Sequence, residues 1–216
     1  MLKFFTKFTT IGIAATTLIT LGQAPQPKLD LPFGSVVRRS SPDGSKTLFL
    51  VPYRSGVNDK PQLWVEDTRT HRRQMLMNIA RTLSAAWNAD GSAFYVQDNE
   101  NSDDAFSYIY DAKTLKRLDL GERILASDPG ARRFTEGHFY FDVDRWQGLW
   151  QVIVRLHGHT DQPPPVVCFD LRYRVTRASA VAKLSQRFFP QTTVVGELTG
   201  GLSTILLSNL CRVFQL

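Results

Sequence analysis

The feature that most limits how this chain can fold is a polar turn containing Asp-Gly that leads directly into an apolar strand. One copy spans Asn88–Asp98, with the sequence NADGSAFYVQD, and an earlier copy spans Ser41–Leu50, with the sequence SPDGSKTLFL. A looser third copy runs from Glu136 to Asp142. Such turns, each followed by aromatic and β-branched residues, are typical of antiparallel strands. The middle of the chain is therefore predicted to be a β-repeat.

Turn chemistry explains these two residue types. An aspartate side chain accepts a hydrogen bond from the backbone of its own turn, and glycine tolerates positive φ. We therefore interpret Asp43 and Asp90 as turn formers, and we expect Gly44 and Gly91 to have positive φ.

A second pattern repeats along the chain: an apolar strand, then an aspartate, then a basic turn. It occurs at Leu63–Thr70, Ser107–Thr114 and Val166–Tyr173. Gly44 and Gly91 are 47 positions apart, and Asp67 and Asp111 are 44 apart. A period in the forties with several strands per unit indicates propeller blades. The period stretches to 59 between Asp111 and Asp170, so the regularity decays toward the C-terminus.

The two Asp-Gly turns resemble the W-S-P-D-G-x motif of the TolB-type, WD-like β-propellers. The resemblance covers about residues 36–120 and is poorer up to 175. It implies an exported protein, or the propeller domain of a larger enzyme, that serves as a binding platform. The chain departs from the motif at Ser40, where the aromatic residue would stand, and at Ala89, where the proline would stand. Three units are also too few for a ring of the usual size.

The predicted fold is therefore mainly β, with antiparallel four-stranded blade-like repeats that form an incomplete propeller or a propeller-derived sheet domain. Residues 36–178 form the β-repeat domain, with units at about 36–78, 82–120 and 130–175. The expected strands in the first two units are Lys46–Val51, Gln62–Glu66, Gln74–Met77, Ala93–Gln97, Ser107–Tyr110 and Leu115–Leu118. From Ser179 to Phe188 the apolar spacing becomes helical, which predicts a short helix before an apolar tail that ends at 216.

The N-terminus predicts export. Lys3 and Lys7 precede an apolar run, and small residues end at Ala24, so residues 1–24 are interpreted as a signal peptide. Residues 25–35 are an extended lead-in. We expect a periplasmic or secreted protein with no transmembrane span after cleavage, and an uncleaved anchor is the alternative. Cleavage lowers the formal net charge from +6 to +4.

The basic residues occur as scattered pairs that are interpreted as solvated turns. The pairs are Arg38-Arg39, Arg72-Arg73, Lys116-Arg117 and Arg132-Arg133. Nucleic-acid binding requires such pairs on one face, so no nucleic-acid partner is expected. Contact with an anionic envelope surface stays open.

The loop from Asp98 to Asp104 is rich in oxygen ligands. It lacks the ligand spacing, the central glycine and the closing glutamate of a calcium-binding hand. We interpret it as the solvated tip of a hairpin, with a weak calcium site as the alternative.

The third unit contains the clearest hairpin, whose first strand carries Trp150, Val152, Val154 and Leu156 on one face. His157 and His159 lie at i and i+2 on the other face, so their imidazoles point the same way. With Asp161, they are the candidate metal ligands, zinc being one such metal. His138 and Asp142 are the nearest candidates for further ligands, and paired histidines at a solvated tip are the alternative.

Cys168 and Cys211 are the only cysteines in the sequence. Export would permit a disulfide between them, whereas their apolar neighbours are equally compatible with two buried thiols.

No catalytic constellation stands out: Gly201–Ile205 lacks the closing glycine of a nucleophile elbow, and phosphate and dinucleotide motifs are missing. The sequence thus favours an exported, non-catalytic module, without a cofactor, that binds a protein or the cell envelope. The apolar tail is a candidate surface for self-association. The alternatives are a metal-assisted hydrolase centred on His157 and His159, and the remnant propeller of a peptidase that has lost its catalytic domain.

Overall fold

The computed structural model describes residues 38–52, 60–160, 167–176, 178 and 180–190. They form twelve strands, one α-helix and one 3-10 helix. In chain order these are β1 (Arg38–Ser40), β2 (Lys46–Val51), β3 (Gln62–Asp67), β4 (Arg73–Asn78), β5 (Thr82–Trp87), β6 (Ala93–Asn99), β7 (Asp104–Asp111), β8 (Arg117–Asp119), α1 (Leu120–Ser127), η1 (Pro129–Phe134), β9 (His138–Trp146), β10 (Gln151–His159), β11 (Val167–Thr176) and β12 (Val181–Pro190). The predicted fold class, mainly β with antiparallel four-stranded units, is confirmed.

The two Asp-Gly turns have the geometry that their sequence predicts. The carboxylate of Asp43 accepts a hydrogen bond from the backbone N–H two residues later, at 3.1 Å, and Asp90 accepts the equivalent bond at 3.0 Å. Gly44 and Gly91 have φ angles of +70° and +74°. Each turn joins two antiparallel strands, β1 to β2 and β5 to β6.

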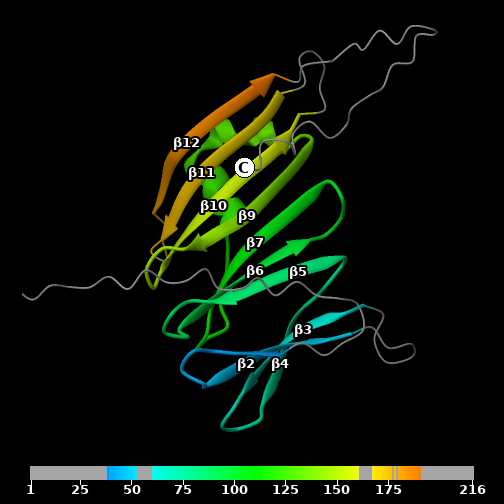
Figure 1. The fold of residues 1–216 in the computed structure, drawn as a ribbon, viewed down its shortest axis with the longest axis vertical. Coiled ribbons are helices and arrows are strands. Elements are labelled where there is room, and N and C mark those ends of the chain that lie inside the picture. Colours follow the sequence, from blue (N-terminus) through cyan, green and yellow to red (C-terminus); the bar gives the residue numbers. More distant parts are fainter. Residues whose placement is uncertain (1–37, 53–59, 161–166, 177, 179, 191–216) are drawn as a thin grey trace, which may run out of the picture.

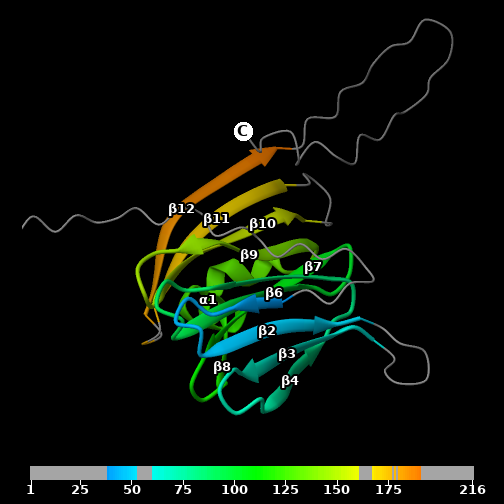
Figure 2. The same ribbon diagram turned by 60° about the horizontal axis from the view of Figure 1, so that its bottom comes forward.

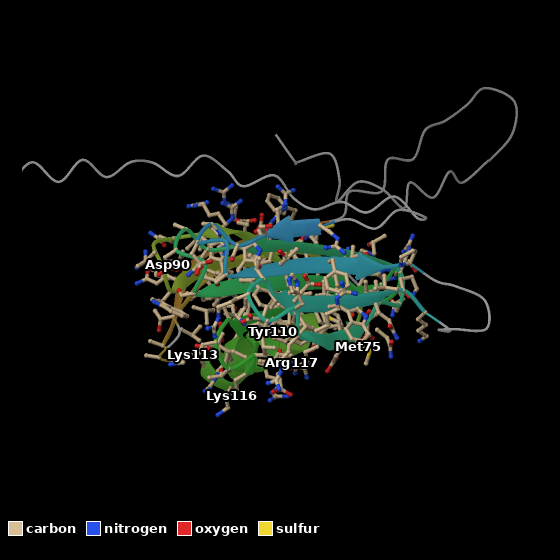
Figure 3. The ribbon with its side chains drawn as sticks, turned by 90° about the horizontal axis from the view of Figure 1, so that it is seen from below. Met75, Asp90, Tyr110, Lys113, Lys116 and Arg117 are labelled. Carbon is tan, nitrogen blue, oxygen red and sulfur yellow. The ribbon has the colours of Figure 1, made fainter. Side chains whose placement is uncertain are left out.

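The turns after β3 and β7 are also copies of each other. The carboxylates of Asp67 and Asp111 each accept a backbone N–H and a hydroxyl from the threonine three residues later, at 2.8–2.9 Å. The next residue has positive φ in both turns, +57° at His71 and +56° at Leu115. The predicted strand over 115–118 therefore begins too early, since Leu115 belongs to the turn and β8 begins at Arg117. Arg117, at the start of β8, pairs with Tyr110, and both are labelled in Figure 3 with Lys113 and Lys116 of this turn.

The strands form three units of four, which we call the first (β1–β4), second (β5–β8) and third (β9–β12) units. The first unit is a separate antiparallel sheet in the order β1-β2-β3-β4. The second and third units are joined into an eight-stranded sheet, because β9 pairs in parallel with the beginning of β7 at Asp104 and Ala105. Figures 1 and 2 show the units following one another from the blue strands to the orange β12.

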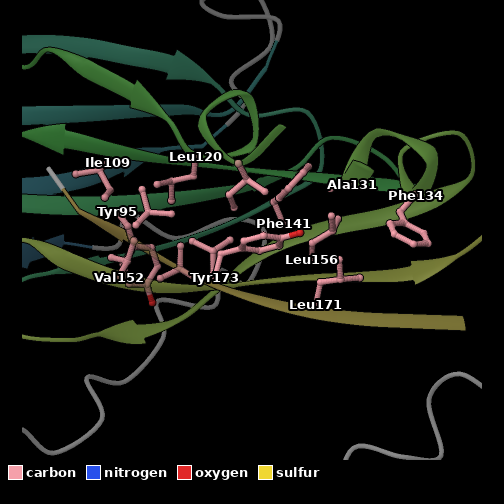
Figure 4. Packing of buried hydrophobic residues seen from close by; sticks show 14 of the residues in the cluster. Tyr95, Ile109, Leu120, Ala131, Phe134, Phe141, Val152, Leu156, Leu171 and Tyr173 are labelled. Carbon is pink, nitrogen blue, oxygen red and sulfur yellow. The ribbon is translucent and has the colours of Figure 1, made fainter. Parts of the chain in front are cut away.

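Two hydrophobic cores separate the units. One core lies between the first and second units and contains Leu48, Leu63, Trp87 and Phe94. The other lies between the second unit, the two helices and the third unit (Figure 4), with the buried residues Tyr95, Ile109, Leu120, Ile124, Phe134, Phe141, Val152, Leu156, Leu171 and Tyr173. The second unit is thus buried on both faces, so successive units pack face to face as propeller blades do.

The C-terminal part of the third unit differs from the prediction in two ways. Asp170 lies within β11, so the predicted basic turn after it is absent and the strand continues to Thr176. The helix predicted over residues 179–188 is wrong: this segment forms β12, the last strand of the sheet. A β-bulge at Leu184 shifts the register of β12 against β11.

The helix of the described residues, α1, lies instead between β8 and β9. Asp119 caps it by accepting a hydrogen bond from the N–H of Glu122 at 2.9 Å. Leu120 and Ile124 are buried in the second core, so the helix fills the space between the second and third units.

Several predictions fall on residues outside the described ones. These are the signal peptide at 1–24, the lead-in at 25–35, Asp161 and the apolar tail from 191 to 216. Within the described part of the chain, no helix has the length and hydropathy needed to cross a membrane.

Candidate histidine and carboxylate site

The outer face of the third unit carries most of its polar side chains. In the β9–β10 register His138 pairs with His159, Tyr140 with His157, and Asp142 with Arg155. Because these six positions share one face of the pleat, the alternate residues, such as Phe141 and Leu156, point into the core.

A hydrogen-bonded group of three side chains occupies the centre of this face. Nε2 of His157 lies 2.8 Å from Oδ2 of Asp142. The other carboxylate oxygen accepts a hydrogen bond from Nε2 of Gln97, on β6, at 2.6 Å. The side chains of His157 and Asp142 are only 20% and 25% exposed. The glutamine therefore fixes the carboxylate that orients the imidazole.

A second pair of histidines lies at the end of the same strands. The rings of His138 and His159 stack with centroids 4.4 Å apart, and Nδ1 of His138 is 3.1 Å from Oδ1 of Asp103. Gly158 allows the backbones of β9 and β10 to lie close together here, because a Cβ at this position would lie 1.8 Å from the carbonyl oxygen of His138. The His-Gly-His sequence thus has a packing reason for its glycine.

The network continues across β11 through arginine and aspartate. Arg155 contacts Asp170 at 2.9 Å, and Arg172 lies 3.8 Å from Asp170 and 3.9 Å from Asp144. The side chains of Arg155 and Asp170 are 20% and 16% exposed. This largely buried ion pair extends the polar face from β10 onto β11.

The predicted metal ligands lie partly together. His157 and His159 share a face, as the sequence predicts, and the two further candidates, His138 and Asp142, lie beside them. Each imidazole nevertheless has its own carboxylate or ring partner. Across the described residues no group of three His, Cys, Asp or Glu side chains is arranged to hold a metal. Asp161 lies outside the described residues, so the three-residue site stays a prediction.

Sequence reasoning missed Gln97, Tyr140 and Asp170. Gln97 lies 45 positions before Asp142 and reaches it only because β9 pairs beside β7. Tyr140 and Asp170 could have been found from the alternation of polar residues along β9, β10 and β11, because such alternation indicates one polar face of a sheet.

Cys168 lies on this same face, buried on β11 opposite His159. Cys211 is outside the described residues, so the disulfide between them stays a prediction.

Chemically, a carboxylate-bound imidazole can act as a general base. The same arrangement also satisfies the polar groups of an outer sheet face, since nearly every charged side chain here contacts one of opposite charge.

Comparison with known proteins gives limited similarity. No family model matches the chain, and no curated protein matches it. Among solved structures, TolB from Acinetobacter baumannii is 13% identical, with a TM-score of 0.34 over 70% of this chain and 32% of that one. A TolB structure from Agrobacterium tumefaciens is 11% identical, with a TM-score of 0.35 over 76% of this chain and 53% of that one. The chain spans about a third to a half of these structures.

Proposed function

We propose that this chain is an exported, non-catalytic binding module made of three propeller-like units, and that it binds an extended protein segment along β12. The observation that carries the proposal is the exposure of β12 at the end of the eight-stranded sheet. Among the described strands, β12 pairs with β11 alone, so no described strand covers its other edge, where an added strand could pair.

The outer faces of the first and third units are consistent with a stack of three units that does not close into a ring. In the first unit, Phe49 is 4% exposed because Arg38 and Arg73 cover its ring at 5.4 and 5.2 Å. In the third unit, the outer face carries the histidine and carboxylate network. Polar outer faces are what end units of a repeat stack require for solubility.

The side chains of β12 indicate the chemistry of its partner. Leu184 and Phe188 are 43% and 41% exposed, although Phe188 also contacts Phe134 at 5.4 Å between ring centroids. Arg133 lies 5.9 Å from the ring of Phe188. Arg187 is an exposed cation of the same strand. An extended segment with alternating apolar and acidic residues would complement this edge.

A synthetic peptide of alternating Glu and Val tests the proposal, with binding measured by fluorescence anisotropy. We expect Leu184→Ser with Phe188→Ser to weaken binding at least tenfold, which corresponds to about 1.4 kcal/mol. Met75→Ser is the matched control, because Met75 is equally exposed, at 43%, on β4 of the other sheet. A Lys-Val peptide should bind more weakly. Equal binding by all variants would contradict the proposed edge.

Export is part of the same proposal and rests on the charged, apolar and small-residue succession in residues 1–24. Intact-mass measurement of the exported protein tests it. The expected mature chain begins near Pro25, and a cytosolic protein that retains Met1 would refute export.

The histidine and carboxylate site supports a second candidate, metal-assisted hydrolysis. The favouring observation is the 2.8 Å contact between His157 and Asp142, which resembles a general-base pair. Zinc content of the purified protein, followed by ester hydrolysis of His157→Gln, separates the two candidates. Stoichiometric zinc with activity lost in the variant would favour the enzyme.

A further inference from the structure

Acidic side chains gather where the β6–β7 hairpin meets the first unit. Asp98 lies near the end of β6 and is only 3% exposed. Asp104 begins β7, and Glu100 lies in the connecting loop. Within the described part of the chain, Oδ1 of Asp98 and Oδ1 of Asp104 are both buried and have no hydrogen-bond partner.

Strand register puts these two carboxylates on one face of the second unit. Asp98 alternates with Val96 and Phe94 on β6, and Asp104 alternates with Phe106 and Tyr108 on β7. These apolar residues belong to the core between the first and second units. The two side chains therefore point toward the first unit, and a charge there is costly without a partner.

The electrostatics of this position favour a cation. Burial, and then the charges of Glu100 and Asp104, raise the pKa of Asp98 to about 6. The opposing influence is the ammonium of Lys60, and the phenols of Tyr108 and Tyr110 face the same region. Glu100 is exposed and Asp104 is partly buried, so the excess of negative charge acts on one buried carboxylate, that of Asp98.

We propose that Asp98 and Asp104 bind a calcium ion at this junction. Their donors are oxygen atoms alone, which suits a hard cation and not zinc. No third acidic, histidine or cysteine ligand is positioned beside them among the described residues, so backbone carbonyls and water complete the coordination. Two carboxylates place the site in the low-affinity class with dissociation constants of about 0.1–1 mM, which extracellular calcium can occupy.

Calcium binding is expected to stabilise the fold. The ion binds the buried carboxylate of Asp98 and the partly buried carboxylate of Asp104 in the folded state only, so unfolding releases it. At a calcium concentration ten times the dissociation constant, the unfolding equilibrium constant should fall about tenfold.

Urea unfolding at pH 7.5 after treatment with EDTA tests the inference, in buffer with calcium chloride, with magnesium chloride, or with sodium chloride of equal ionic strength. We expect calcium to stabilise the protein more than either control salt. Asp98→Asn should abolish this response and, in EDTA, should be more stable than the unaltered protein because it removes a buried charge. Asp104→Asn should also lose the response.

Glu136→Gln is the matched control, since Glu136 is an exposed acid outside this cluster and should leave the calcium response unchanged. Two results would overturn the inference: no calcium effect beyond that of sodium chloride, or an undiminished effect in Asp98→Asn. A third result would also overturn it, namely stability that falls as the pH rises through 6 without any calcium effect. Asp98 would then be a carboxyl that the fold keeps protonated.

Discussion

Gly158→Ala gives the sharpest test of how the histidine face is built. Gly158 has a φ of +151°, and a Cβ at this position would lie 1.8 Å from the carbonyl oxygen of His138 and 3.0 Å from Cα of Phe139. Both contacts involve backbone atoms, so no side chain can rotate away. Alanine must therefore displace β9 from β10 by more than about 1 Å to restore an ordinary packing distance.

The expected loss follows from two contributions. Positive φ costs an alanine about 1–3 kcal/mol. Displacing β9 breaks the pairing on either side of Gly158, and loss of about two or three backbone hydrogen bonds adds roughly 2–3 kcal/mol. The variant should therefore lose about 4 kcal/mol or more of unfolding free energy, or fail to fold.

Gly148→Ala is the matched control. Gly148 lies in the turn between the same two strands with a φ of +73°, and nothing lies within 4 Å of its Cβ position. It should lose only the backbone contribution of about 1–3 kcal/mol. Urea midpoints of the two variants measure the difference, and losses equal within about 0.5 kcal/mol would refute the close approach at Gly158.

Three further predictions concern the repeated turns. His71→Gly should stabilise the protein by about 0.5–1 kcal/mol, since His71 is exposed and has positive φ. Leu115→Gly should not stabilise it, because the side chain of Leu115 also packs on the core between the first and second units. Thermal unfolding of the two variants compares them. Hydrogen bonds from the backbone N–H and hydroxyl of the threonine three residues later lower the pKa of Asp67 to about 2. This carboxylate therefore stabilises the fold above pH 3.8 and loses that effect as the pH falls toward 2, so Asp67→Asn should flatten the pH dependence of urea midpoints in this range, and an unchanged slope would contradict the assignment. Gly91→Ala should destabilise by about 1 kcal/mol more than Gly44→Ala, because its Cβ would meet a carboxylate oxygen of the first turn at 2.6 Å while Gly44 has open space; identical midpoints would exclude that contact.

Local chemistry explains why parts of the first two units could be predicted. β2 has the predicted bounds, and β3, β4, β6 and β7 contain the predicted strands. Each of these strands has turn residues close to one of its ends and carries enough apolar or β-branched residues to fit a pleated surface. β5 was missed because Thr82–Trp87 is buried on both faces and contains small residues, so it shows no polar alternation.

The candidate site was predictable only within one strand. The spacing of His157 and His159 determines that they share a face, and this required no knowledge of other strands. Their partners Asp142 and His138 depend on the register of β9 against β10, which a glycine and a β-bulge adjust. Gln97 depends on the joint between β7 and β9, where no local signal exists.

The sequence by itself determined the turns, the period of the first two units and the β character of the chain, because these follow from interactions within a few residues. Tertiary structure alone decided that β12 is a strand, since pairing with β11 outweighs a helical spacing of three apolar residues. It also decided that two units share one sheet and that Asp98 is buried on the same face of the second unit as the partly buried Asp104. These outcomes depend on contacts between segments far apart in the chain, where packing and burial set the free energy and local preference contributes little.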